Sequence, residues 1–147
     1  MTDQRRLSQE EIADRLEIAD LLARYCHAID SKQWELLDGV FTPDARIDYT
    51  TSGGIQGRFP EVKDWLAKTL VHFPMTQHLV TNLQIEIQGD RATSRAYFYN
   101  PMGEPKPEGP GLKLFFVGGY YLDKLTRTPA GWRISERFEQ QAWMAGR

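Results

Sequence analysis

The chain has 147 residues, of which 41% are hydrophobic and 26% charged, and its formal net charge is −2. This length fits a single domain with a substantial buried core, which we expect to span residues 1–147. Charges of both signs are mixed along the chain without a basic stripe, and this argues against nucleic acid as a partner.

Helical patterns dominate the N-terminal part of the chain. Ser8 and Glu11 form a capping-box pattern that predicts the start of a helix, and apolar residues at helical spacing continue as far as Ile29. Asp30 interrupts this pattern together with the serine after it, and a shorter second helix is predicted over residues 31–40.

One strand and a third helix follow. Pro43 and Asp44 are typical of a turn, and residues 45–50 alternate between apolar and polar side chains, which predicts a half-buried strand. Pro60 favours the first position of a helix, which Pro74 would end.

The C-terminal half has strand patterns. Four strands are predicted, at residues 76–87, 92–99, 112–126 and 132–141. Residues 100–111 are rich in proline and glycine and are predicted to form a loop. Helices first and antiparallel strands later indicate the α+β class, and a long twisted sheet can curl around the helices and leave a cavity.

The three histidines differ in their surroundings. His27 lies within the first predicted helix and His72 at the end of the third, where both suit polar surface positions. His78 lies among apolar residues at the start of a predicted inner strand. It could be a core histidine with a satisfied hydrogen bond, or a general base, since imidazole titrates near neutral pH.

Two further residues are candidates for chemistry. Asp30 could cap the second helix, or it could be the carboxylate that orients His78 and stabilises its charged form. Tyr49 lies on the same strand face as Ile47, so its hydroxyl could reach a cavity and bind a substrate carbonyl. Spacing alone does not bring residues 30 and 78 together.

Several classes of site have no signature here. The chain lacks a Gly-rich phosphate loop, Gly-x-Ser-x-Gly and His-Glu-x-x-His, and its one cysteine, Cys26, allows neither an internal disulfide nor a multi-cysteine zinc site. We therefore expect no metal and no cofactor. No apolar run approaches the roughly 18 residues of a membrane span and no signal-peptide pattern is present, so we expect a cytosolic protein that does not bind membranes.

Three segments together resemble a known family. Residues 25–34 (Tyr-Cys-His-Ala-Ile-Asp-Ser-Lys-Gln-Trp), residues 46–49 (Arg-Ile-Asp-Tyr) and residues 76–78 (Thr-Gln-His) resemble the SnoaL-like branch of the nuclear-transport-factor-two-like superfamily. The resemblance covers about residues 8–143. Within this branch the chain is similar to scytalone dehydratase, bile-acid 7α-dehydratase and hexachlorocyclohexane dehydrochlorinase.

The resemblance implies a cone-shaped α+β barrel, with N-terminal helices packed on a curved, mostly antiparallel sheet that encloses a pocket. It also implies that Asp30 and His78 form a catalytic dyad, that Tyr49 binds a substrate carbonyl, and that Tyr25 matches the first-helix tyrosine of bile-acid dehydratase. Three residues depart from the pattern of these enzymes: Ile29, Asn100 and Met102. The departures argue against scytalone itself as the substrate.

The leading hypothesis is a cofactor-independent, dehydratase-like lyase in which His78, polarised by Asp30, removes a proton from carbon. Tyr49 and Asn100 would donate hydrogen bonds to the developing oxyanion. The substrate would be a small, hydrophobic, cyclic or aromatic molecule. The residues expected to shape its pocket are Trp34, Trp65, Leu66, Phe98, Met102 and Phe116.

Two rival functions stay open at this point. The same dyad could catalyse isomerisation or cyclisation, or the chain could be a non-catalytic accessory subunit like the small subunits of ring-hydroxylating oxygenases. Self-association is also expected, through the apolar strand at residues 112–121 on the open sheet face, with a trimer favoured over a dimer.

Overall fold

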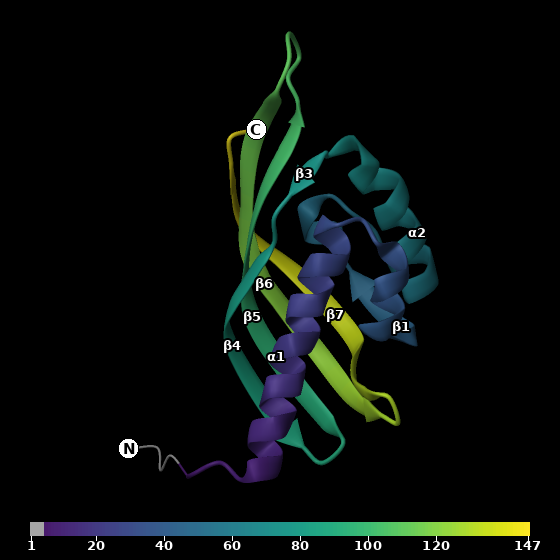
Figure 1. Cartoon of the computed structure of the whole chain (residues 1–147), viewed down its shortest axis with the longest axis vertical. Coiled ribbons are helices and arrows are strands. Elements are labelled where there is room, and N and C mark those ends of the chain that lie inside the picture. Colours follow the sequence, from purple (N-terminus) through teal and green to yellow (C-terminus); the bar gives the residue numbers. More distant parts are fainter. Residues whose placement is uncertain (1–4) are drawn as a thin grey trace.

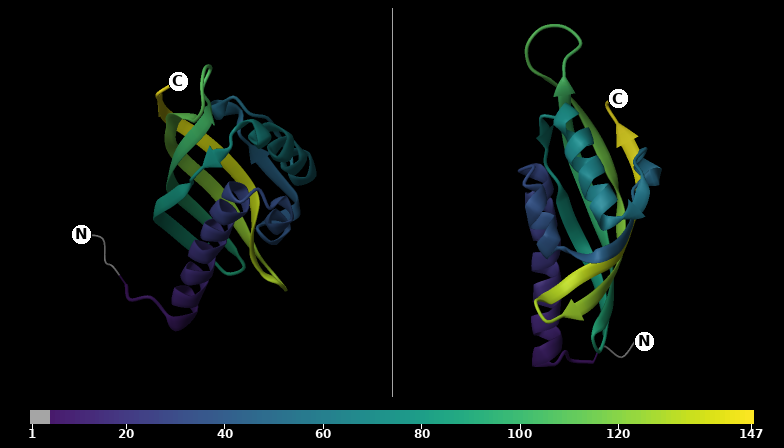
Figure 2. Two further views of the ribbon diagram at one scale, coloured as in Figure 1. Left: turned by 45° about the horizontal axis from the view of Figure 1, so that its top comes forward. Right: turned by 90° about the vertical axis from the view of Figure 1, so that its right-hand side faces the viewer.

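The computed structural model describes residues 5–147, which form a curved sheet with helices against one of its faces (Figures 1 and 2). The helices are α1 (Gln9–Asp30), η1 (Trp34–Gly39), η2 (Thr50–Ser52), α2 (Phe59–Thr69) and η3 (Leu70–His72), of which the three labelled η are 3-10 helices. The strands are β1 (Phe41–Asp48), β2 (Gln56–Arg58), β3 (Met75–Thr76), β4 (Leu79–Gln88), β5 (Arg91–Pro105), β6 (Leu112–Thr128) and β7 (Gly131–Ala145).

Local sequence signals explain where the helices begin and end. The hydroxyl of Ser8 accepts a hydrogen bond from the backbone N–H of Glu11 at 3.2 Å, so the predicted N-terminal cap of α1 is confirmed. At the other end, the Ser31 hydroxyl donates to the carbonyl of His27 and closes the last turn. Pro60 was predicted at the first position of a helix and is the second residue of α2, still within the first turn, where its missing N–H leaves no unmet hydrogen bond.

The sheet is mostly antiparallel. Its strand order is β2-β1-β7-β6-β5-β3, with β4 also paired to β5, and β1 runs parallel to β7. The expected α+β class, with helices on a curved and mostly antiparallel sheet, is confirmed. Successive side chains of a strand point to opposite faces, so the inner face carries every second residue toward the helices.

Three local predictions were wrong. Pro43 and Asp44 lie inside β1 rather than in a turn, because β1 pairs with β7 on both sides of a bulge in this region. The strand predicted over residues 76–87 is two strands, β3 and β4. The predicted loop over residues 100–111 is shorter, because β5 stays paired with β6 as far as Pro105 and only residues 106–111 turn at the tip of a projecting hairpin (Figure 1).

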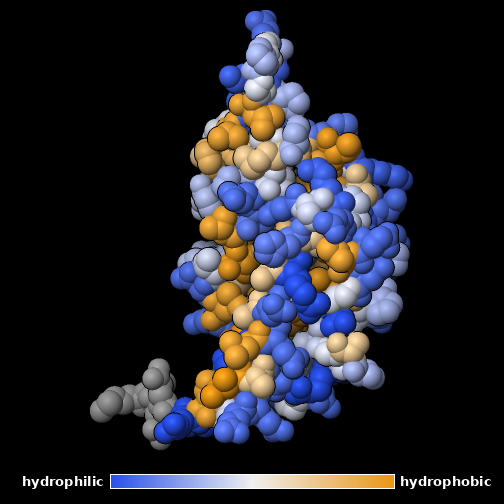
Figure 3. All heavy atoms as spheres, viewed as in Figure 1, coloured by the Kyte–Doolittle hydropathy of each residue, from blue (hydrophilic) through white to orange (hydrophobic). Residues whose placement is uncertain are grey.

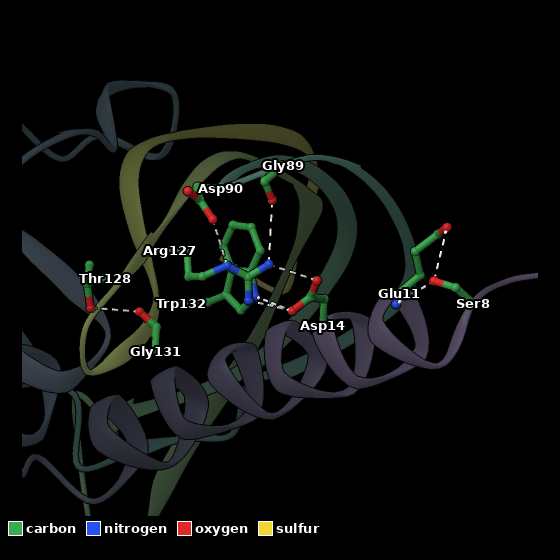
Figure 4. A network of polar contacts seen from close by, with 9 residues as sticks. All are labelled: Ser8, Glu11, Asp14, Gly89, Asp90, Arg127, Thr128, Gly131 and Trp132. Carbon is green, nitrogen blue, oxygen red and sulfur yellow. Dashed lines mark hydrogen bonds and ion pairs between the residues drawn. The ribbon is translucent and has the colours of Figure 1, made fainter.

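A buried carboxylate fastens the N-terminal half of α1 to the sheet. Asp14 is 7% exposed and accepts two hydrogen bonds from the guanidinium of Arg127, at 2.7 and 2.9 Å, and one from the indole N–H of Trp132 at 3.0 Å (Figure 4). Arg127 also binds Asp90 at 3.0 Å and lies over the ring of Trp132. These bonds outweigh the effect of burial and hold the pKa of Asp14 below its ordinary value.

Some large apolar side chains remain exposed. Figure 3 shows them along the N-terminal half of α1 and near the base of the projecting hairpin, where Leu16 and Leu114 are 67% and 46% exposed. Within residues 5–147, no helix has the length and apolar character needed to cross a bilayer. A cytosolic location and the self-association of the sheet face stay predictions.

Replacing Asp14 by Asn should destabilise the fold by about 1–3 kcal/mol at neutral pH, since hydrogen bonds to a buried charge are lost. Because the pKa of Asp14 is lowered on folding, its contribution is complete above the unfolded value of about 3.9 and is lost as the pH falls through the folded value. Urea unfolding of both proteins between pH 7 and pH 3 should show the difference shrinking at acid pH. The control is Asp20→Asn on the same helix, whose side chain is 71% exposed; an equal loss in both variants would contradict the assignment.

Candidate functional site

A cavity of about 240 Å³ lies between the helices and the inner face of the sheet. Side chains from α1, α2, β5, β6, β7 and the segments that follow β1 and β3 line it. Most of the lining is apolar or aromatic, and a few polar groups converge on it, which is the usual make-up of a small-molecule site.

Asp30 and His78 meet at the wall of this cavity. The carboxylate of Asp30 accepts hydrogen bonds from the hydroxyl of Thr76 and from the backbone N–H of His78, both at 2.8 Å. Its Oδ1 atom also lies 2.7 Å from Nδ1 of the His78 ring. Asp30 therefore does not cap the following η1 helix, whose N-cap residue is Gln33 and which has no side-chain cap.

These contacts determine the ionisation of Asp30 and the ring tautomer of His78. Burial alone would raise the pKa of Asp30, but the hydrogen bonds from His78 and Thr76 and the charge of His78 outweigh it, and the pKa lies below its ordinary value. An ionised Asp30 keeps the proton of the His78 ring on Nδ1, and Nε2 is then the atom with a free lone pair. Nε2 has no hydrogen-bond partner in residues 5–147, and His78 lines the cavity.

Two phenols lie at the same cavity. The hydroxyls of Tyr25, on α1, and Tyr49, just after β1, are 2.8 Å apart and share one hydrogen bond. Burial raises the pKa of both tyrosines well above the ordinary value, so both are neutral donors at physiological pH. One phenolic proton joins the two oxygens, and the other is available to a ligand.

A buried arginine supports these tyrosines. Arg137 is 1% exposed and binds both carboxylate oxygens of Asp123, each at 2.8 Å. The centre of its guanidinium lies 4.2 Å from the ring centroid of Tyr25 and 3.9 Å from that of Tyr121. Such cation–π contacts fix the orientation of the rings. The Tyr25 hydroxyl is therefore held in a defined place at the cavity.

The cavity also receives polar side chains from the sheet. Asn100 on β5 is 6% exposed, and its Oδ1 has no hydrogen-bond partner in the described part of the chain. The same is true of Oε1 of Gln141 on β7. Glu139, two residues before Gln141, also lines the cavity and is 9% exposed. Buried polar atoms without partners are uncommon, and they mark positions where a bound molecule would be contacted.

The expected pocket residues fall into two groups. Trp65, Leu66, Phe98 and Met102 line the cavity, together with Asn100. Trp34 and Phe116, expected there too, do not. Trp34 packs against the core from η1, and Phe116 points to the outer face of the sheet, where it stacks on Tyr99. Strand alternation places Phe115, one residue earlier, at the cavity instead.

Glu139 and Gln141 are cavity residues that the sequence interpretation missed. On β7 the buried positions change from even numbers (Trp132, Ile134) to odd numbers (Arg137, Glu139). The switch occurs at a bulge, because Lys124 pairs with Glu136 and Leu125 with Ile134, which leaves Ser135 without a partner in the register. Regular alternation would have placed Glu139 outside. The Arg-x-Glu spacing was a signal, but it equally suits a solvated strand face.

A metal site finds no support in the described residues. Across residues 5–147, no group of three or more His, Cys, Asp or Glu side chains is arranged to hold an ion. His27 and His72 are both exposed and lie apart from the cavity lining.

Comparison with curated proteins and solved structures places the chain among relatives. It is 45% identical over 141 residues to Rv2910c, an uncharacterised protein of Mycobacterium tuberculosis, with 96% of this chain and 94% of the relative covered. The Kfla4162 protein of Kribbella flavida is similar at 27% identity, with a TM-score of 0.82 and coverage of 91% and 94%. A Novosphingobium aromaticivorans protein, provisionally described as an aromatic ring hydroxylase, matches at 27% identity, a TM-score of 0.80 and coverage of 92% and 94%.

A second protein of Novosphingobium aromaticivorans, provisionally described as a scytalone dehydratase, shares the fold at 20% identity, with a TM-score of 0.78 and coverage of 96% and 92%. The model of the SnoaL-like domain matches residues 10–138. The chain therefore belongs to the SnoaL-like domain family, and its fold is that of the nuclear-transport-factor-two-like superfamily.

Proposed function

We propose that this protein is a cofactor-independent lyase in which His78 removes a proton from a carbon next to a carbonyl group and a small group leaves. The observation that carries the proposal is the 2.7 Å contact between Asp30 Oδ1 and His78 Nδ1 beside a mostly apolar cavity. A base needs a partner that fixes its tautomer and its direction, and Asp30 meets this need.

Proton transfer would use Nε2 of His78, the nitrogen that Asp30 leaves free. As the proton moves to Nε2, positive charge develops on the ring beside the carboxylate, and Asp30 stabilises that charge. Its other two hydrogen bonds, from Thr76 and the backbone of His78, keep the carboxylate in place. The dyad would thus be pre-organised before a substrate binds.

The oxyanion formed on the substrate carbonyl would be stabilised by neutral donors. Tyr25 and Tyr49 share one hydrogen bond, so the second phenolic proton can be donated to the oxyanion. The side-chain amide of Asn100 is a further donor at the same cavity. Donors aimed at developing charge in a dry site commonly contribute a large share of catalysis.

The lining suggests the class of substrate. Trp65, Leu66, Phe98 and Phe115 offer flat and aliphatic surfaces, which suit a small, hydrophobic, cyclic or aromatic molecule. Isomerisation or cyclisation by the same dyad is the nearest rival, and it conserves the mass of the substrate whereas elimination does not. A purely accessory role required Asp30 and His78 to lie beyond hydrogen-bond reach, and the 2.7 Å contact speaks against it.

Replacing His78 by Gln should lower kcat on a panel of cyclic β-hydroxy-ketones by roughly 100- to 10,000-fold, because the proton acceptor is removed. Asp30→Asn should lower kcat as well, with less effect on KM, since it disturbs the tautomer rather than substrate binding. Product formation followed by absorbance and mass spectrometry measures both. His72→Gln, on an exposed histidine, is the matched control. Unchanged turnover in His78→Gln would overturn the mechanism.

The two tyrosines should be unequal in their effects. Removing one hydroxyl, in Tyr25→Phe or Tyr49→Phe, leaves the other phenol without its shared hydrogen bond. The variant that removes the donor to the substrate should lower kcat by roughly 100-fold, while the other should change it far less. Steady-state kinetics of both single variants and the double variant separates the roles. Full activity of the double variant would show that the pair does not take part.

A further inference from the structure

Glu139 is a buried carboxyl group that the dyad mechanism does not use. It lies on β7, lines the same cavity as His78, and is 9% exposed. Its side chain forms no ion pair within residues 5–147, although Arg137 lies two residues away on the same strand. A carboxyl group is seldom buried in this way unless it is paired or functional.

The nearby arginine is already engaged. Both of its bonds to a carboxylate go to Asp123, with Nε and one terminal nitrogen at 2.8 Å from the two oxygens. Arg137 and Asp123 thus largely cancel each other's charge in a fully buried pair. Arg137 therefore does little to offset the free-energy cost of burying a charged Glu139.

The groups around Glu139 favour its protonated form. Burial raises the pKa of Glu139, and a hydrogen bond with Ser52 and the charges of His78 and Arg137 offset this only in part. The cavity lining also holds Arg147, which is paired with Glu104 at 3.3 Å. The remaining titratable groups near Glu139 are the phenols of Tyr25, Tyr49 and Tyr121. All three are neutral at physiological pH, because burial raises their pKa well above the ordinary value.

We propose that Glu139 is a second catalytic residue, the general acid that protonates a poor leaving group while His78 acts as the base. The assignment rests on the proposed lyase function and narrows its substrates to β-hydroxy carbonyl compounds, which lose water. A hydroxide ion leaves carbon reluctantly unless it receives a proton in the same step. The carboxylic acid of Glu139, which lines the same cavity as His78, would supply that proton.

The bonds balance as follows in the forward reaction. His78 Nε2 takes the proton from the α-carbon, and the electron pair of that C–H bond forms the new C=C bond. The bond between the β-carbon and the hydroxyl oxygen breaks, its electron pair stays on the oxygen, and Glu139 gives that oxygen its proton to release water. The proton on His78 then returns to the Glu139 carboxylate, which restores the starting state.

The test uses two probes that differ only in what leaves: a cyclic β-hydroxy-ketone and its β-(4-nitrophenoxy) analogue, whose leaving anion needs no proton. Three variants of the full chain are compared: Glu139→Gln, His78→Gln and the control Glu136→Gln. Glu136 lies on the same strand, but it is exposed and outside the cavity lining. Circular dichroism and thermal unfolding check that each variant folds.

Glu139→Gln should lose roughly 100-fold or more of kcat on the hydroxy-ketone, yet stay near wild type on the nitrophenoxy probe. His78→Gln should lose activity on both probes. If Glu139→Gln affects both probes equally, or neither, the role of Glu139 as acid is overturned while the dyad stands. If the wild-type protein turns over neither probe, the proposed lyase function itself fails.

A second measurement does not depend on turnover. Carbon-13 NMR of the side-chain carboxyls, with Glu139→Gln to assign the signal, gives the titration of Glu139 in the intact protein. Its midpoint should lie above the value of about 4.3 for an unperturbed glutamate. A midpoint at or below that value would remove the proton donor and overturn the proposal, whatever the kinetics show.

Discussion

The Asp30 carboxylate holds together the two parts of the chain on which the site depends. It lies at the last residue of α1 and accepts hydrogen bonds from Thr76 and from both the backbone and the ring of His78, 46 to 48 residues away in sequence. Because the His78 N–H bonds to Asp30 rather than to a neighbouring strand, β3 ends at Thr76 and β4 begins at Leu79. This short break turns the imidazole toward the cavity. One carboxylate therefore shapes the backbone and orients the ring at once.

The second fixed point is the buried Arg137–Asp123 pair beneath the tyrosines. A pair of this kind gives little net stability by itself, because the cost of desolvating both charges offsets much of their attraction. Its value here is positional: the flat guanidinium lies against the rings of Tyr25 and Tyr121 and limits how they can tilt. Tyr25 is thereby kept within 2.8 Å of Tyr49. The ion pair does not line the cavity itself but fixes the position of a tyrosine that does.

Sequence patterns predicted the elements more readily than the site. The cap at Ser8, the end of α1 and the buried alternation of Ala45, Ile47 and Tyr49 all follow from local rules, since helix caps and strand pleats involve neighbouring residues. The contact between Asp30 and His78 joins distant elements, and only the family resemblance predicted it.

The errors in the predicted site and strands have a common cause, which is pairing between residues that are distant in sequence. The sequence of β6 does not show which of its alternate residues face inward, so Phe116 was predicted at the cavity in place of its neighbour Phe115. Glu139 was missed because a bulge at Ser135 exchanges the inward and outward positions of β7. Long-range pairing with β6 also extended β5 through Pro101 and Pro105.

The two acid–base groups of the cavity stand in opposite electrostatic surroundings. His78 lies beside the ionised Asp30 carboxylate, whose Oδ1 is 2.7 Å from Nδ1 of the ring. Glu139 is buried with no ion-pair partner among residues 5–147, which favours the form that still holds one. A carboxyl group that burial keeps protonated is a usual candidate for the acid of an acid–base pair. An isomerase can work with one base that returns its proton to carbon, but an elimination of water must also protonate the hydroxyl group that leaves. The proposed base at His78 and the proposed acid at Glu139, both at one cavity, would therefore fit the loss of water better than isomerisation.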